Sequence, residues 1–292
     1  MMPFRIFWFL LAALALSACS ADPRSDETPP SPALWEVTSP EGRQGWLFGT
    51  AHVLPRCATW RTELFDQALA GSGEILVEID LRMDNAERAA ILGRMSQSPG
   101  LPAIGERVAP GMAAALDQMI ARHGLSPRDF ARTETWAVAL VLSNAATPVD
   151  FVPGVDRYIL GEAEDRPVVE MEGLEMQLGI FDRLPEARQA ELLQAVVSEA
   201  ANGEDQRRAI VEMWRTGNVE ALAASTEARL EASPELRQAL LVDRNHAWLE
   251  PIEAAISRGK RPFVAVGAAH MTGTDGVVAL LQDRGYRILR VQ

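Results

Sequence analysis

Short apolar segments that end in glycine or in acidic residues constrain the fold of this 292-residue chain most strongly. The clearest is RPFVAVGA at 261–268, where apolar residues follow one another without alternation. Such a run is typical of a strand that is buried on both faces of a sheet. Five further strands are expected, at 34–40, 44–52, 74–81, 166–172 and 286–292.

Helical periodicity fills most of the chain between these strands. It dominates residues 84–160 and returns over 173–258. Strands that alternate with helices predict an α/β fold, with a mixed central sheet and helices on both of its faces. We expect the largely helical middle segment to form a cap over that sheet.

The first residues have the pattern of a bacterial lipoprotein signal. A basic MMPFR precedes the apolar IFWFLLAALAL, which is too short to span a membrane comfortably. The sequence LSAC that follows resembles a lipobox, so we expect a signal peptide at 1–18 and a lipidated Cys19. The alternative is an ordinary signal peptide cut near Ala18.

Residues 19–32 are rich in Pro, Ser and Asp, which predicts a disordered tether between the lipid and one folded domain at 33–292. The protein would then face the periplasm of the bacterial cell envelope, attached to a membrane through its N-terminal lipid only. Ser20 after the cysteine favours the outer membrane.

The formal net charge of −12 excludes whole classes of partner. Nucleic acid requires basic patches to neutralise its phosphates, and this chain is acidic, so we expect no nucleic-acid binding. The same charge argues against binding to anionic lipid.

Two of the four histidines share a local pattern. Gly49 precedes His52 and Gly267 precedes His270, and both segments read Gly-x-Ala-His after an apolar strand. Ligands of open α/β sheets bind beyond the carboxyl ends of the strands, and glycine allows the backbone to turn there and to approach a ligand. The two imidazoles are therefore expected to converge, although each alone could be structural.

Acidic residues end two other predicted strands and supply a third ligand for a metal site. Glu78 and Asp80 lie on one face of 74–81, and Glu172 ends the strand at 166–172. Two histidines and one carboxylate leave open positions for water and substrate, as in hydrolytic metal sites. For Asp80, pairing with the neighbouring Arg82 is the structural alternative.

The other two histidines are better explained without function. His123 ends a predicted helix, where its charge interacts favourably with the helix dipole, and His246 sits on an amphipathic helix. The chain has no His-Glu-x-x-His helix, nucleophile elbow or phosphate loop, which argues against zincin, serine-hydrolase and nucleotide chemistry.

Over residues 33–292 the chain resembles the TraB/GumN family, which is related to the TIKI metalloproteases. LWEVTSPEGRQGWLFGTAHVLP, ILVEIDL and FVAVGAAHMTGTDGVVALLQDRGYRILRV are similar to its opening, acidic and closing blocks. GVDRYILGEA, EMEGLEMQLGIFDRLP and LVDRNHAWLEPI are similar to its internal blocks. The resemblance implies a fold related to erythromycin esterase and to haem-binding ChaN-like proteins.

The resemblance also implies a divalent-metal-dependent peptidase and places its site by position. His52, His270 and Glu78 would hold Mn, Co or Zn, while Glu172 and the Arg244-Asn245 pair would line or support the site.

These observations lead us to expect a lipid-anchored metal-dependent hydrolase with a peptide or protein substrate. Asp80 or Glu172 would act as general base, and Arg244 would stabilise an oxyanion. Two alternatives stay open. One is a metal-independent His/Glu hydrolase, and the other is a periplasmic lipoprotein that binds a peptide or haem without turnover.

Overall fold

The structure is a computed structural model that describes residues 28–201 and 203–292. The expected signal peptide, Cys19 and most of the expected tether lie outside the described residues. Ser31 already contacts the fold, since its amide donates to the carbonyl oxygen of Arg215 at 2.7 Å, and Pro32 is buried. Ordered contacts therefore begin slightly before residue 33.

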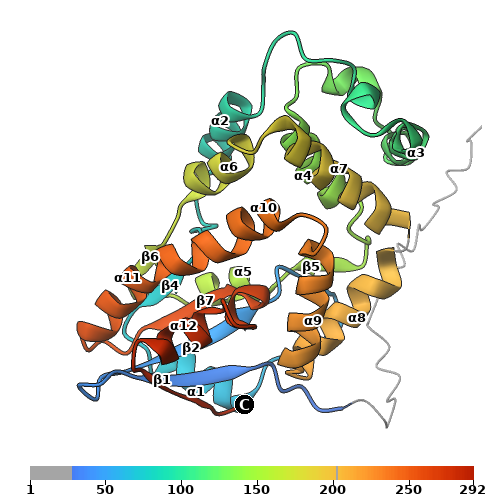
Figure 1. The fold of residues 1–292 in the computed structure, drawn as a ribbon. Coiled ribbons are helices and arrows are strands. Elements are labelled where there is room, and N and C mark those ends of the chain that lie inside the picture. Colours follow the sequence, from blue (N-terminus) through green and yellow to red (C-terminus); the bar gives the residue numbers. More distant parts are fainter. Residues whose placement is uncertain (1–27, 202) are drawn as a thin grey trace, which may run out of the picture.

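Six strands form one mixed sheet in the order β6-β4-β7-β2-β1-β8 (Figure 1). These strands are β1 Leu34–Thr38, β2 Gln44–Thr50, β4 Ile75–Val77, β6 Val168–Glu170, β7 Phe263–Gly267 and β8 Arg287–Arg290. β6, β4, β7 and β2 run parallel, and β1 is antiparallel to both β2 and β8. Each of the six coincides with an expected strand, so the predicted α/β fold with a mixed central sheet is confirmed.

The position of β7 explains its uninterrupted apolar sequence. All five of its residues are buried, because β4 and β2 pair with it on either side and helices cover both faces of the sheet. Burial on both faces removes the alternation that a half-exposed strand would need. β4 is buried throughout for the same reason.

One face of the sheet carries an aromatic core. Phe48 of β2 lies 4.9 Å from Phe65 and 5.9 Å from Phe263, measured between ring centroids. The helices that cover this face are α1 Glu63–Ala70, α5 Val155–Gly161, α8 Gly203–Arg215 and α9 Val219–Leu230.

Aliphatic residues dominate the other face. Leu47, Leu76 and Val264 of the sheet pack there against Trp248 and Ile252. The covering helices are α11 Asp243–Ser257 and α12 Val277–Asp283. Helices therefore flank both faces, as the sequence predicts.

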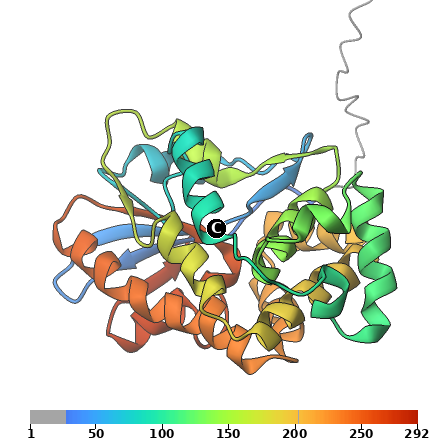
Figure 2. The same ribbon diagram turned by 90° about the horizontal axis from the view of Figure 1, so that it is seen from above.

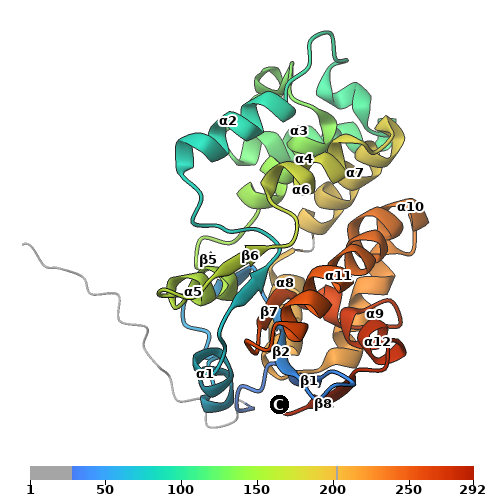
Figure 3. The same cartoon turned by 90° about the vertical axis from the view of Figure 1, so that its left-hand side faces the viewer.

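The middle of the chain builds a separate helical core. Leu116, Ile120, Val138, Leu142 and Leu193 meet in a cluster that contains no residue of the sheet. The main helices of this part are α2 Asn85–Met95, α3 Ala113–Arg122, α4 Thr135–Ala145, α6 Leu174–Asp182 and α7 Glu186–Ala201. Figures 1 and 3 show these helices together above the sheet, and Figure 2 shows the green α3 and α4 to one side of it.

Shorter segments complete the described chain. Helical turns occur at η1 Ile104–Arg107, η2 Pro110–Met112, η3 Pro127–Phe130, α10 Pro234–Arg237, η4 Gln238–Val242 and η5 Ala268–Met271. A two-stranded ribbon that the sequence did not indicate pairs β3 Val53–Pro55 with β5 Phe151–Pro153. Among the described residues, no helix has both the length and the apolar character needed to cross a membrane.

Candidate functional site

His52, Glu78 and His270 follow three adjacent strands of the sheet. Their strands, β2, β4 and β7, are parallel neighbours, so their carboxyl ends meet at one edge. A Cβ atom placed on Gly267 would lie 3.1 Å from Nε2 of His52 and 3.3 Å from Oε1 of Glu78. The amide of Gly267 also donates to Oε1 of Glu78 at 2.7 Å. The imidazole of His52 and the carboxylate of Glu78 therefore meet over Gly267.

The two motif glycines are needed for different reasons. A Cβ on Gly49 would lie only 2.9 Å from Cα of Ala268, so Gly49 allows the two motif backbones to touch. A Cβ on Gly267 would instead occupy the space that His52 and Glu78 share. Gly49 thus serves backbone packing, and Gly267 serves the arrangement of the site.

Asp156 on α5 holds the ring of His52. Its Oδ2 lies 3.0 Å from Nδ1 of His52, and its Oδ1 accepts a hydrogen bond from Thr50 at 2.7 Å. Desolvation by the surrounding chain lowers the pKa of His52, although the side chain of His52 is 65% exposed. The hydrogen bond and charge of Asp156 prevail and raise the pKa of His52 to about 9.

Backbone hydrogen bonds also hold the segment of Asp156 against the segment of His52. Gly154 donates to the carbonyl oxygen of His52 at 2.8 Å, and Val155 donates to that of Ala51 at 3.0 Å. A Cβ on Gly154 would overlap the carbonyl oxygen of Ala51, so this contact requires glycine. Sequence reasoning missed Asp156. The available indication was its place in GVDRYILGEA, one of the blocks that carry the family resemblance.

His270 lies in a different environment, buried at 7% exposure in η5. Its Nδ1 is 2.6 Å from Oδ1 of Asn245, whose amide nitrogen donates to the carbonyl oxygen of Asp275 at 2.7 Å. Because Asn245 uses its NH2 group on Asp275, its oxygen accepts the proton on Nδ1, and Nε2 of His270 keeps its lone pair. Burial lowers the pKa of His270 to about 3, despite the nearby charge of Glu78.

Arg244 on α11 connects these groups. Its guanidinium donates to Oε2 of Glu78 at 2.6 Å and to both oxygens of Glu172 at 2.7 and 2.9 Å. Its Nη1 lies 3.1 Å from Nε2 of His270, and its Cζ lies 4.9 Å from the ring centroid of Trp248. Burial opposes the ionisation of Glu78, but the two histidines and Arg244 lower its pKa below the usual range.

Asp80 does not join this group. β4 ends at Val77, and the carboxylate of Asp80 turns to Arg82, which donates to it from Nε at 2.8 Å. This hydrogen bond lowers the pKa of Asp80. In the structure, Asp80 is therefore paired with Arg82, which is the structural alternative for this residue. His123 is the C-cap of α3, and His246 is exposed on α11, as their structural interpretations predict.

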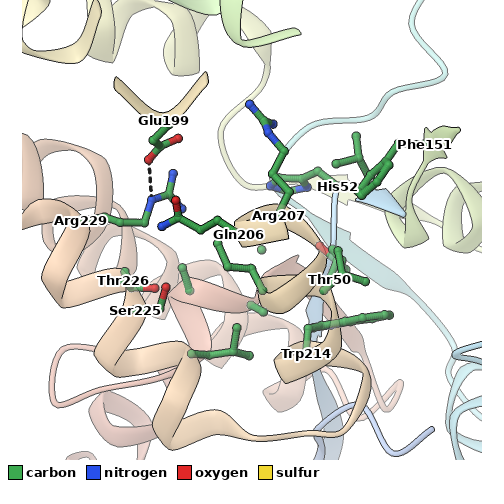
Figure 4. Close-up of a pocket in the computed structure, with 18 of the residues that line it drawn as sticks. Thr50, His52, Phe151, Glu199, Gln206, Arg207, Trp214, Ser225, Thr226 and Arg229 are labelled. Carbon is green, nitrogen blue, oxygen red and sulfur yellow. Dashed lines mark hydrogen bonds and ion pairs between the residues drawn. The ribbon is translucent and has the colours of Figure 1, made fainter. Parts of the chain in front are cut away.

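Two cavities meet at His52. The larger has a volume of about 380 Å³, is lined by residues 50–52 and 267–270 of the two motifs, and is bounded by α8 and α9 (Figure 4). The smaller, of about 240 Å³, lies on the side of Glu78, Asp156 and Gln177. A substrate could therefore extend to either side of the exposed imidazole.

The family model of the TraB/PrgY/gumN family matches residues 33–290. The chain belongs to the TraB/PrgY/gumN family. Among curated relatives, the uncharacterized proteins YbaP of Escherichia coli K12 and of Shigella flexneri are each 26% identical over 257 residues. These alignments cover 85% of this chain and 91% of each relative. No solved structure matches the chain with significance.

The donor groups fit a divalent metal ion in their chemistry. Both histidines have Nδ1 engaged by an oxygen acceptor, which leaves Nε2 as the atom that would coordinate a metal ion, and Glu78 would add an ionised oxygen donor. Within residues 28–201 and 203–292, no group of three or more His, Cys, Asp or Glu is placed to hold a metal ion. Binding by all three predicted ligands would require Arg244 to move away from His270 and Glu78.

Proposed function

We propose that this chain is a hydrolase of the bacterial cell envelope that cleaves peptides with a divalent metal ion. The observation that supports this most directly is that His52 and Glu78 meet over Gly267. Arg244 contacts both Glu78 and His270, and so connects the second histidine to this pair. These groups have the donor types of a hydrolytic metal site.

In this proposal His52, His270 and Glu78 hold Mn, Co or Zn. When bound, the ion would polarise the scissile carbonyl and lower the pKa of its water. Asp156 and Asn245 keep the two imidazoles oriented through Nδ1. Arg244 supplies positive charge for a developing oxyanion, and Glu172 holds that guanidinium in place.

A test begins with the metal content of gently purified protein, followed by hydrolysis of a peptide library with and without chelator. His52→Ala, His270→Ala and Glu78→Gln should each abolish turnover. The matched control is His246→Ala, which removes an exposed histidine of α11 and should leave activity unchanged. If the protein contains no metal and chelator has no effect on turnover, the metal assignment fails.

A metal-independent hydrolase is the second candidate, because Arg244 contacts Nε2 of His270 in this structure. Here the ionised Glu78 would take a proton from the attacking water, and charged His52 would give one to the leaving group. Turnover that persists in chelator but is lost in His52→Ala would favour this candidate. A protein that performs its cellular role without both histidines would instead be a binding lipoprotein, for a peptide or haem.

We also propose that Cys19 carries a lipid and attaches the folded domain to the outer membrane. The supporting observation is the LSAC sequence after the apolar segment. Mass spectrometry of the mature N-terminus should show an acylated Cys19. Recovery of Cys19→Ala in the membrane fraction at the level of the unchanged protein would contradict anchoring through this residue.

A further inference from the structure

The lining of the larger cavity, beside the two histidines, has an apolar part and a polar part. Ile210, Val211, Trp214 and Leu222 give it an apolar side on α8 and α9. The indole nitrogen of Trp214 donates to the carbonyl oxygen of Gly49 at 2.7 Å, so this wall presents the ring and no free polar atom of Trp214. An apolar group of a ligand is favoured on this side.

Other side chains of the same two helices make part of the lining polar, with an unbalanced positive charge. Arg229 is neutralised by Glu199, with its Nε 2.8 Å from Oε1. Arg207 of α8 is half-buried and forms no hydrogen bond or ion pair with any residue that the structure describes. Arg207 and His52 both line this cavity, and they overlap in the view of Figure 4.

An unpaired guanidinium in the cavity of an acidic protein is an anion-binding group. We propose that this cavity recognises a carboxylate adjacent to an apolar side chain, with Arg207 binding the carboxylate and the apolar wall receiving the side chain. This inference rests on the proposed function and names its substrate class, namely peptides that present an apolar residue with a carboxylate next to the scissile bond. The carboxylate could come from the C-terminus of the peptide or from an acidic side chain.

Binding of small probes tests the inference without requiring turnover. Calorimetry would compare N-acetyl-leucine with N-acetyl-leucinamide, which differ only in the carboxylate. The acid should bind about tenfold more tightly than the amide, because a charge-assisted pair replaces a neutral contact. Arg207→Gln should remove this difference, Arg207→Lys should keep most of it, and Arg122→Gln, an exposed arginine of α3, should keep all of it.

The source of the carboxylate is decided by three peptides of the same length. One ends in a free leucine carboxylate, one is its amide, and one is an amide with glutamate before the leucine. Faster cleavage of the first assigns the terminus, and faster cleavage of the third assigns the side chain. Equal binding of N-acetyl-leucine and its amide to the unchanged protein would overturn the inference, whereas absent hydrolysis with a tenfold binding difference would overturn only the proposed function.

Discussion

Arg244 contacts Nε2 of His270 across 3.1 Å, at the atom through which this histidine would bind a metal ion. The same guanidinium forms ion pairs with Glu78 and Glu172, whose side chains are 10% and 4% exposed. One arginine therefore neutralises the buried negative charge that a divalent ion would otherwise balance. In the proposed metal site, the stability of the protein and its affinity for metal would therefore be linked through this residue.

Replacing Arg244 with glutamine should destabilise the metal-free protein strongly. Two buried carboxylates would lose their cation, and breaking a buried ion pair costs about 3–5 kcal/mol of unfolding free energy. Urea denaturation monitored by circular dichroism measures this cost. The exposed Arg122→Gln should stay within about 0.5 kcal/mol of the unchanged protein, and a similar value for both variants would contradict the role assigned to Arg244.

Added Mn²⁺ should stabilise Arg244→Gln more than it stabilises the unchanged protein. In the variant the ion meets Glu78, Glu172 and His270 without first displacing a guanidinium. Melting temperatures at increasing Mn²⁺ concentrations provide the comparison. An equal shift in both proteins would show that the ion and Arg244 do not compete.

Metal binding should release one proton near neutral pH, and the proton should come from His52. A pKa of about 9 leaves this ring charged at pH 7, whereas His270, with a pKa of about 3, and Glu78, with a lowered pKa, are already deprotonated. The affinity for Mn²⁺ should therefore rise about tenfold per pH unit up to the pKa of His52. Calorimetry in buffers of different ionisation enthalpy counts the protons, and release of none would exclude His52 as a ligand.

Asp156→Asn should return the pKa of His52 towards its ordinary value, because the hydrogen bond and charge of Asp156 raise it. NMR titration of the metal-free protein follows the ring directly. The raised pKa also fixes the sign of the effect on stability. The stabilisation of the folded protein by the His52–Asp156 pair is fully present below about pH 6.5 and is lost as pH rises through about 9. An unchanged titration of His52 in Asp156→Asn would contradict the assignment.

Replacing the two motif glycines with alanine, one at a time, should affect the stability of the protein and the geometry of the site to different degrees. Gly49→Ala places Cβ 2.9 Å from a backbone atom of Ala268, so it should lower the melting temperature. Gly267→Ala meets the side chains of His52 and Glu78, which can rotate away. It should therefore impair turnover with a smaller loss of stability. Melting curves and peptide hydrolysis of both variants test this, and equal melting temperatures would argue against it.

The strand ends were predictable because they follow from local pattern. Apolar runs such as that of β7 mark a doubly covered strand, and the parallel order then brings His52, Glu78 and His270 to one edge. Helices on both faces of the sheet were predictable from the alternation of strands with helices along the chain.

Contacts made by tertiary packing were not predictable. Asp156 reaches His52 because the backbone of Gly154 and Val155 docks on the loop after β2, and no periodicity encodes that docking. Asp80 was expected at the end of a strand that in fact stops at Val77. The contact of Arg244 with His270 likewise depends on the packing of α11 against the sheet.

The sheet order has a consequence for biosynthesis. β7 is inserted between β4 and β2, yet almost all of the chain precedes it. Until residues 263–267 have been synthesised, β4 and β2 lack the strand that lies between them in the sheet. The sheet can therefore close only after residues 263–267 have been synthesised, and until then β2 and β4 each have an unpaired edge.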